Sequence, residues 1–551
     1  MADGDMLIEG LGEAAPAKPV LNLEALKALG TTLAARFSQY EKDRNLAELK
    51  WVRNARQFLG IYDPEVEAQI PSNRSKAYPK ITRVKCVSML ARLMNLLFPA
   101  DDKCWGARPS AVPDLVQEDL QKVLDDAARA AQEGGYELTD EAIEQAIRTF
   151  ARAQADRLEL EMEDQLQDVG GSARLSFVQL CRQVLYSGIL YGMGILKGPY
   201  IEMRTMRTWA KDVDGKFVAT PVEVYRPRYE FVAIWDYYPD MSAKYLHQMS
   251  GHFERHVFSK HQLIALKSRP DFFAEQIDEV IRRNPDGNYR CRTHETTLQS
   301  MGVHKAVGSQ PRGKFEAMAW EGHMSGKDLA ELGVEVPDNL QAEDVRATVW
   351  IMDDIVIKAE MSPWTLLDAP DDMPTYHHFV FEEDESSLLG NGLPNIMRDS
   401  QMSLASATRM AIDNASLMRV FEVNTGLLTL NQDTSAITPD RIFYRDDPSP
   451  ATANIPALKV VDLPLKVGEL TSLVQLFQGF ADQETFVNPA TGGDMQKGPS
   501  EPFRTATGAS MLQGAAALPF KDVVRNFDRF MESVIGSLIV FNRNYNPDPR
   551  L

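Results

Sequence analysis

The sequence predicts an α+β protein, because helix-like and strand-like stretches occupy separate parts of the chain. Apolar residues recur with helical spacing through residues 21–194, whereas residues 195–390 mix short helices with strand-like runs. After residue 391, long helices alternate with two loops rich in Pro, Gly and Thr. The chain has 551 residues, of which 44% are hydrophobic and 25% charged, so it is long enough for several substructures and a large core.

The N-terminal part is predicted to be helical after an acidic arm, residues 1–20, which we expect to be disordered. A leucine stripe predicts a helix from residue 21 to about residue 62, with a break at the charged sequence EKDRN. Residues 81–98 predict a second helix that is apolar on most sides and therefore buried. Residues 114–168 read as helix interrupted by a glycine pair, and residues 175–191 read as another buried helix.

Strands are expected from residue 195 onwards, and several local motifs there have structural explanations. The runs PVEVY and EFVAIW are typical of paired strands. YGMGILKGP has the glycines and lysine of a phosphate loop, but a helix precedes it and a strand follows, so a helix-to-strand turn is favoured. Asp353 and Asp354 lie between two apolar runs and predict a tight hairpin turn rather than a metal-binding carboxylate pair.

The histidines and cysteines do not form a recognisable catalytic or metal-binding motif. His252, His256 and His261 lie close together, but strand-like alternation favours polar surface or an interface over a metal site. His377 and His378 are expected on opposite faces of a strand. The four cysteines are far apart and are expected to be free, buried thiols. We therefore expect no enzymatic activity, no cofactor and no bound metal.

Charge and hydropathy restrict the kinds of partner that the chain can have. A net charge of −19 and a pI near 5.1 argue against tight binding of nucleic acid by phosphate neutralisation, although they are compatible with a protein that surrounds DNA without gripping it. The N-terminus lacks the features of a signal peptide, and the most apolar C-terminal run, VIGSLIVF, is too short to span a bilayer. These features predict a soluble protein of the cytoplasm in which it is made.

The last third of the chain consists of helices and loops in a definite order. A first helix, residues 391–424, would be roughly 45 Å long from Gly392 to Phe421 at 1.5 Å per residue. Residues 425–466 form an insert rich in Pro, Thr and Asp, and residues 467–487 predict a second helix. A 17-residue Gly- and Pro-rich segment, residues 488–504, precedes a last helical region, residues 505–551. In the first helix, small residues recur every four positions and allow another helix to approach closely: Ser403, Ala407, Ala411 and Ala415.

In order and residues, this succession resembles the portal, or head-to-tail connector, proteins of tailed bacteriophages, especially short-tailed ones. LLGNGLPNIMRD is similar to the Gly- and Pro-marked start of their first stem helix, and RTATGASM resembles the start of the helix after their tunnel loop. Upstream, LLFPADDKCWGARP and LYGMGILKG resemble the wing-helix exit and the helix-to-strand step. The resemblance covers most of residues 30–545, and its specificity lies in the succession of parts.

The resemblance implies a portal-like α+β fold with a name for each part. Residues 21–390 would be the wing body, helical to residue 194 and strand-rich afterwards. The remaining parts follow in chain order: first stem helix 391–424, clip 425–466, second stem helix 467–487, tunnel loop 488–504, and kinked helix with a short crown remnant 505–551. Few residues follow the last helix, so the crown is expected to be short or missing. The implied assembly is a ring, of twelve subunits.

The implied function is a DNA conduit without catalytic activity. A portal ring occupies one capsid vertex of the virion, conducts double-stranded DNA during packaging, retention and ejection, and assembles in the host cytoplasm. Its implied partners are the terminase large subunit, whose ATPase supplies the energy, a tail adaptor, and the major capsid and scaffolding proteins. No membrane partner is expected.

The resemblance also places candidate contact residues in the two loops. In the tunnel loop, Gln496, Lys497 and Arg504 are candidates for passing contacts with DNA, although these polar side chains are equally well explained as solvating the loop tip. The accessible clip candidates for docking terminase and adaptor are Arg441, Tyr444, Arg445, Asp446 and Asp447.

Two other functions are compatible with the sequence. One is a non-portal structural or scaffolding protein of a large viral assembly, which would use the long helices for coiled-coil contacts; the small-residue stripe and the Pro and Gly interruptions do not favour it. The other is a hydrolase whose carboxylates or histidines converge only in the folded chain.

Overall fold

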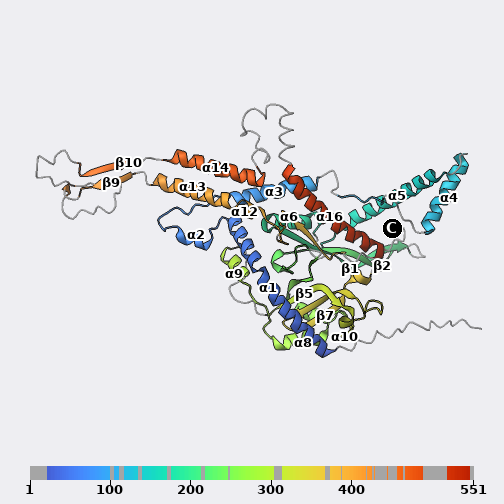
Figure 1. The fold of residues 1–551 in the computed structure, drawn as a ribbon. Coiled ribbons are helices and arrows are strands. Elements are labelled where there is room, and N and C mark those ends of the chain that lie inside the picture. Colours follow the sequence, from blue (N-terminus) through green and yellow to red (C-terminus); the bar gives the residue numbers. More distant parts are fainter. Residues whose placement is uncertain are drawn as a thin grey trace, which may run out of the picture. The chain divides into compact units, whose positions relative to one another are not determined.

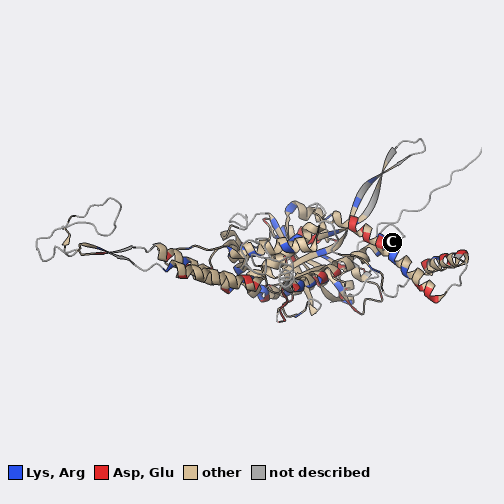
Figure 2. Ribbon diagram, turned by 90° about the horizontal axis from the view of Figure 1, so that it is seen from above, with Lys and Arg blue, Asp and Glu red and all other residues tan. Residues whose placement is uncertain are grey.

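The structure is a computed structural model that describes most of the chain. The described residues are 22–99, 105–110, 117–134, 139–170, 175–211, 217–245, 248–302, 313–366, 373–385, 387–416, 419–424, 427–428, 444, 456–462, 466–487 and 518–545. They contain many helices and three sheets, as expected for an α+β protein (Figure 1). Acidic and basic residues are interspersed along these elements (Figure 2).

The chain divides into two compact units, each built from separated segments. The first unit comprises residues 1–54, 89–392 and 517–551, and the second comprises residues 55–88 and 393–516. The expected wing body, residues 21–390, is thus not one uninterrupted segment of a single unit, because residues 55–88 group with the C-terminal third. Two helices, α1 (Leu23–Leu59) and α3 (Ile81–Leu97), have residues in both units.

The two helices that have residues in both units, α1 and α3, differ from the sequence pattern. The expected break at EKDRN is wrong, because α1 continues through it; Arg44 in this sequence is fully buried and points inward. The expectation that α3 is buried on most sides is also wrong, since Val84, Val87 and Leu96 are exposed. The other helices of the first unit are α4 (Gln117–Gly134), α5 (Asp140–Gln167), α6 (Phe177–Tyr191), α7 (Lys260–Leu266), α8 (Ala274–Arg283), α9 (Thr293–Ser300), α10 (Gly326–Glu331), α11 (Pro363–Leu366) and α16 (Leu518–Tyr545).

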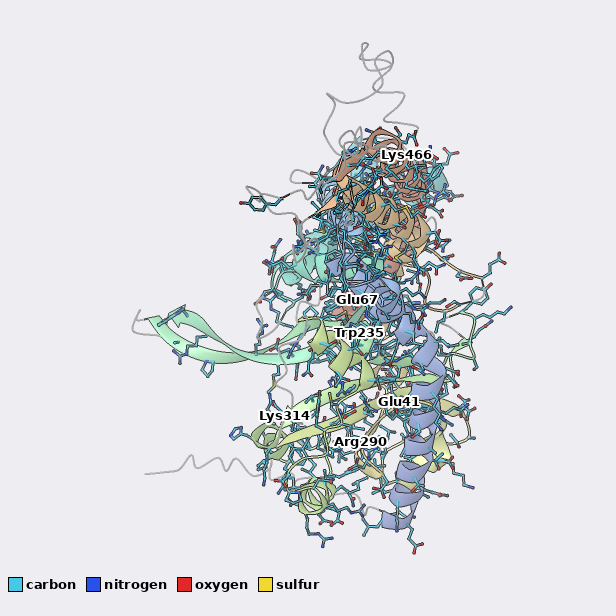
Figure 3. The ribbon with its side chains drawn as sticks, turned by 90° about the vertical axis from the view of Figure 1, so that its left-hand side faces the viewer. Glu41, Glu67, Trp235, Arg290, Lys314 and Lys466 are labelled. Carbon is cyan, nitrogen blue, oxygen red and sulfur yellow. The ribbon has the colours of Figure 1, made fainter. Side chains whose placement is uncertain are left out.

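A three-stranded antiparallel sheet has the order β2-β1-β8. Its strands are β1 (Met193–Lys211), β2 (Phe217–Val232) and β8 (Tyr376–Val380). PVEVY and the start of EFVAIW, both expected in paired strands, belong to the single strand β2, which pairs with β1 from Ile195↔Val232 to Lys211↔Phe217. Beyond its contact with β8, this pair forms a two-stranded ribbon (Figure 3).

The turn between α6 and β1 confirms the helix-to-strand interpretation of YGMGILKGP. Gly192 ends α6 with φ 103°, in the left-handed region that favours glycine. A Cβ atom at this position would lie 2.7 Å from the carbonyl oxygen of Gly390, so a side chain is excluded by space as well as by conformation. The glycines of this motif therefore serve backbone geometry.

A five-stranded antiparallel sheet with the order β3-β4-β5-β6-β7 forms the second layer of the unit. The hairpin predicted at Asp353 and Asp354 is confirmed, since these residues join β6 to β7 and Asp353 has φ 54°. One face of the sheet packs against α1 through Leu33, Phe37 and Tyr40. Its strands are β3 (Tyr237–Pro239), β4 (Gly251–Ser259), β5 (Lys314–Ser325), β6 (Asp344–Met352) and β7 (Ile355–Met361), and a short 3-10 helix, η2 (Ile234–Asp236), precedes β3.

The second unit contains the paired helices of the C-terminal third. The first long helix, α13 (Arg398–Ser416), follows the short α12 (Leu393–Ile396) and ends earlier than expected. The prediction of helix to Phe421 is wrong, because residues Arg419–Val423 form strand β9. Three β-type residues in RVFEV favour an extended backbone there. The remaining elements are α2 (Pro64–Gln69), β10 (Leu458–Asp462) and α14 (Val467–Thr485).

The cysteines differ in their exposure to solvent. Cys86 and Cys181 are buried, as expected, whereas Cys291 is exposed, so the expectation of burial is wrong for that residue. Cys104 lies outside the described residues. Within the part of the chain that the structure describes, no helix is both long and apolar enough to cross a bilayer.

Candidate functional site: the paired helices of the second unit

Helices α13 and α14 pack side by side in opposite directions. Near the start of α13, the Ser400 hydroxyl donates to Glu484 Oε1 at the end of α14 over 2.8 Å. At the other end, the backbone N–H of Lys466 donates to Asn414 Oδ1 over 3.1 Å. Contacts at both ends therefore define an antiparallel pair. Strand β9 follows α13 and strand β10 precedes α14, so the two strands lie at the same end of the pair (Figure 1).

Gln401 fixes the base of this helix pair to residues 55–88. Its side chain is almost fully buried. The carboxamide oxygen accepts hydrogen bonds from the Thr82 N–H and hydroxyl at 3.1 and 3.0 Å, and the amide group donates to the Pro79 carbonyl over 2.8 Å. Gln57 donates a further bond to the Thr82 hydroxyl. The carboxamide suits this place because it satisfies donors and acceptors simultaneously.

Ion pairs reinforce the same base. Lys85 on α3 is buried and bonds both Asp482 of α14 and the carbonyl oxygen of Val487. Arg398, at the start of α13, lies 2.7 Å from Asp63. A buried ammonium is costly unless it is paired. The end of α14 is therefore favoured in the position where Asp482 and the Val487 carbonyl reach Lys85.

At the opposite end of the helix pair, β9 and β10 form a two-stranded antiparallel sheet. The pairs run from Leu458↔Val423 to Asp462↔Arg419. This small sheet joins the first helix to the segment expected to be the clip. The helices thus have a polar, heavily bonded base and a two-stranded tip.

Apolar side chains on the outside of the helix pair are exposed to solvent in the single chain. On α14, Leu473, Leu476 and Phe480 follow the spacing of one helical face, and Leu476 is 49% exposed. On α13, Met410 is 58% exposed and Ile412 is also exposed. Apolar residues gathered in this way on a helical face are typical of a surface that another polypeptide covers.

The small-residue stripe of α13 is only partly used as expected. Ala407 is buried, Ser403 and Ala411 are half-buried, and Ala415 is exposed. Close helix approach is therefore restricted to the middle of the stripe within this chain.

The predicted contact residues are not brought together among the described residues. Gln496, Lys497 and Arg504 of the expected tunnel loop lie outside them, as do Arg441, Arg445, Asp446 and Asp447 of the expected clip. Tyr444 is described, and its side chain is 66% exposed. Its exposure is compatible with docking of another protein.

The first unit contains a buried charge network that sequence reasoning did not find. Lys197 Nζ lies 2.5 Å from Glu254 Oε2, and the Tyr376 hydroxyl donates to the same oxygen over 2.6 Å. Burial alone would raise the pKa of Glu254, but the charges of Lys197 and His256 outweigh it and hold that pKa well below its usual range. These residues come from β1, β4 and β8 and are far apart in the sequence, so only folding brings them together.

Three histidines of the first unit are uncharged at neutral pH; His252 and His377 are buried and His378 is half-buried. Burial is the first cause that lowers the pKa of His252 and His378 to about 3 and that of His377 to about 4. The interpretation of His252 as surface or interface was wrong, because the residue is only 6% exposed. Its position on a strand, and that of His377 and His378, is as predicted.

His377 is held by groups on both of its nitrogens. Its Nε2 lies 2.8 Å from the Gly198 carbonyl, which only accepts, so Nδ1 accepts from the Ser533 hydroxyl at 2.7 Å. The ring thus joins β8 to β1 and α16 and is satisfied without a carboxylate partner. Across the described residues, no group of three or more His, Cys, Asp or Glu side chains is arranged to hold a metal ion.

Comparison with known proteins does not identify the family. Neither a scan against protein-family models nor a search of curated proteins found a match to this chain. The resemblance in the succession of parts and the geometry of the helix pair are therefore the grounds on which a function is proposed.

Proposed function

We propose that this protein is a portal protein of a tailed bacteriophage. Copies of the chain form a closed ring, of twelve subunits, at one capsid vertex, and the ring conducts double-stranded DNA during packaging, retention and ejection. The protein works in the virion, after assembly in the host cytoplasm, and has no catalytic activity of its own. The alternative is a non-portal structural or scaffolding protein of a large viral assembly.

The observation that carries the proposal is the exposed apolar stripe on a helix pair with a fixed base. Leu473, Leu476 and Phe480 face solvent in one chain, and a neighbouring copy in a ring would cover them. Covering a large apolar side chain contributes roughly 1.5–3 kcal/mol, so a repeated contact around a ring is strongly favourable. The bonds of Gln401 and Lys85 hold the pair in a defined geometry, which a closed ring requires.

The two ends of the helix pair support separate roles. In this proposal the tip with β9 and β10 begins the clip, which docks first the terminase large subunit and later a tail adaptor. The segment after α14, residues 488–504, is the tunnel loop that meets DNA. The major capsid and scaffolding proteins contact the outer parts of the ring.

The charge of the chain is compatible with a conduit. Twelve copies would carry a formal charge of 12 × −19 = −228. Phosphates entering such a ring meet little net attraction, so the duplex can slide instead of being held. Energy for movement would come from the terminase ATPase.

Native mass spectrometry of the purified full-length chain tests the assembly. Twelve subunits of 61.7 kDa give an expected mass of 12 × 61.7 = 740 kDa. We expect Leu476→Glu to prevent ring formation, because it places a charge in the proposed contact between copies. Gln475→Glu is the matched control: it introduces the same charge at the adjacent exposed position and leaves the apolar stripe intact.

Two results would argue against the proposal. One is a chain that stays monomeric at micromolar concentration in every salt condition. The other is an open filament of unlimited length, which would favour the alternative of a non-portal structural protein. If Leu476→Glu and Gln475→Glu prevent ring formation equally, the apolar stripe is not the contact that holds the ring together.

A further inference from the structure

Strand β8 is an edge strand of its sheet, and one row of its backbone groups is unpaired in the described structure. The Thr375 carbonyl accepts from the N–H of Gly198 in β1, and the Phe381 N–H donates to the carbonyl of Gly192, which directly precedes β1. The odd-numbered residues of this stretch therefore direct their backbone groups toward β1. The backbone N–H and C=O groups of successive residues point to alternate edges of a strand. Those of Tyr376, His378 and Val380 therefore point away from β1. Among the described strands, none pairs with β8 on that side.

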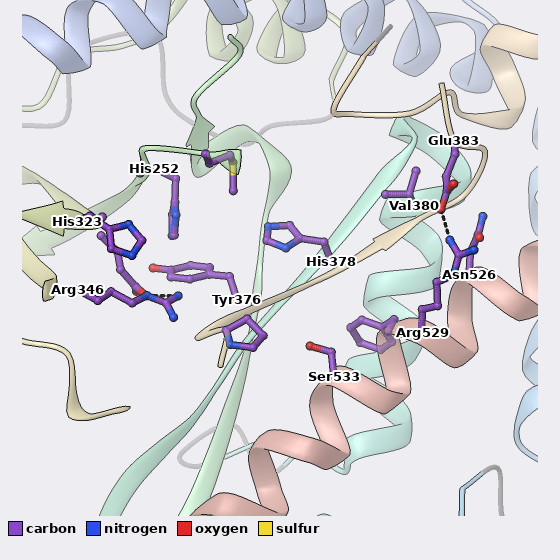
Figure 4. Close-up of a pocket in the computed structure, with 16 residues that line it drawn as sticks. His252, His323, Arg346, Tyr376, His378, Val380, Glu383, Asn526, Arg529 and Ser533 are labelled. Atoms are coloured by element: carbon purple, nitrogen blue, oxygen red, sulfur yellow. Dashed lines mark hydrogen bonds and ion pairs between the residues drawn. The ribbon is translucent and has the colours of Figure 1, made fainter. Parts of the chain in front are cut away.

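The same three residues line a cavity of about 620 Å³ (Figure 4). Its other walls come from β4, β5, β6 and α16, and all of them belong to the first unit. The volume is in the range of cavities that bind organic ligands or short peptide segments. A free strand edge with alternate side chains facing a cavity is the arrangement that binds extended peptides by strand addition.

His252, in the wall of this cavity, has an unsatisfied hydrogen-bonding group. The side chain is more than nine-tenths buried, and its Nε2 atom has no hydrogen-bond partner among the described residues. A buried polar atom left unpaired is unfavourable, so a ligand that reaches it gains from pairing it. The imidazole is uncharged, and a hydroxyl or carboxamide suits either of its tautomers because each of these groups both donates and accepts.

The charges of the lining are balanced. Arg346 lies 2.8 Å from Glu321 in the interior, and Arg529 lies 2.6 Å from Glu383 where both side chains are largely exposed. Each guanidinium is already paired, so neither a polyanion nor a polycation gains a free counter-charge. Tyr376 and Phe530 add aromatic surface to the lining. The lining therefore favours an uncharged segment that has apolar side chains.

From these observations we infer that the first unit binds an extended, uncharged segment of a partner polypeptide as an additional strand on β8. The segment pairs with the outward backbone groups of Tyr376, His378 and Val380, and its alternate side chains enter the cavity. One of these is Ser, Thr, Asn or Gln and bonds His252. This site is independent of ring formation and lies in the other unit from the helix pair.

A selection of random dodecapeptides displayed against the purified full-length chain tests the inference. Affinities of the enriched peptides are then measured by fluorescence polarisation. Val380→Trp fills the cavity and is expected to weaken binding by about tenfold or more. The matched control, Ser38→Trp, places the same side chain at a separate cavity of about 270 Å³ in the same unit and should leave affinity unchanged. His252→Phe should weaken only peptides that carry a hydroxyl or carboxamide.

Hydrogen exchange of the unmodified chain gives a second readout that needs no variant. Bound peptide should slow exchange in the fragment that contains Tyr376, His378 and Val380. The inference is overturned if no peptide is enriched, if the enriched peptides bind Val380→Trp as tightly as the unmodified chain, or if the protected amides lie elsewhere. Because the assay reads a site within one chain, its failure leaves the ring proposal standing, and failure to form a ring leaves this site testable.

Discussion

At the scale of single residues, Arg44 explains why α1 continues through a sequence that looks like a break. Its fully buried guanidinium donates to the carbonyls of Ile234 and Trp235 at 3.3 and 3.1 Å and pairs with Glu48. It also lies 3.5 Å from the ring centroid of Tyr238. A charged run thus contains one residue that is central to the packing of α1.

Removing this guanidinium should be strongly destabilising. We expect Arg44→Met to lower the free energy of unfolding of the first unit by about 3–5 kcal/mol, because the carbonyls of Ile234, Trp235 and Tyr237 lose their donor and Glu48 loses its counter-charge. Lys42→Met, at an exposed position of the same helix, should change it by less than about 0.5 kcal/mol. Urea titration of both variants measures the difference, and equal losses would show that Arg44 has no special role.

The three uncharged histidines, His252, His377 and His378, predict a loss of stability in mild acid. Their pKa values in the folded chain, about 3 for His252 and His378 and about 4 for His377, lie below the ordinary value of 6.5. The unfolded chain therefore binds more protons between these values, so stability falls as the pH drops below about 6.5. At about pH 5 the expected loss is roughly 2 kcal/mol for each histidine.

Urea unfolding at about pH 7.5 and about pH 5 measures this loss. His377→Gln should remove about a third of the pH dependence, since one of the three protons is no longer taken up. His261→Gln, at an exposed residue of α7, is the control and should leave the dependence unchanged. A free energy of unfolding that is the same at both pH values would contradict the burial of neutral imidazoles.

At the scale of elements, the local sequence pattern predicted several helices and turns, whereas contacts between distant residues determine the others. The α6-to-β1 turn, the hairpin at Asp353 and Asp354, and α14 could be predicted because glycines, turn residues and helical spacing act locally. The end of α13 could not, since residues Arg419–Val423 form β9 through pairing with β10, some 40 residues further along the chain. Gln401 carries no local signal either, as its partner Thr82 is 319 residues away.

The base of the helix pair should depend on that distant contact. We expect Gln401→Leu to lower the free energy of unfolding of the second unit by about 2–3 kcal/mol, because the buried Thr82 and Pro79 groups lose their partner. Gln475→Leu, on the exposed surface of α14, should have an effect of less than about 0.5 kcal/mol. Denaturant titration followed by circular dichroism distinguishes the two, and an equally mild effect of both would show that the base is not fixed by Gln401.

At the scale of the whole molecule, the sequence predicted the fold class and the order of elements but not their grouping. Residues 55–88 join the C-terminal third in the second unit, and the cavity beside β8 is assembled from segments spread over residues 249–533. Periodicity cannot reveal such groupings, because it reports only which face of an element is buried. The expected DNA and clip contacts other than Tyr444 lie outside the described residues and stay predictions.

The central proposal concerns an assembly, so the most direct measurement is an image of one. Electron cryomicroscopy of the purified full-length protein, viewed along the symmetry axis, should show a closed ring of twelve copies around an open channel wide enough for a DNA duplex. The helix pair of α13 and α14 should repeat around that axis, with Leu476 at the contact between copies. Particles that remain monomeric, or a closed assembly without a central channel, would contradict a portal.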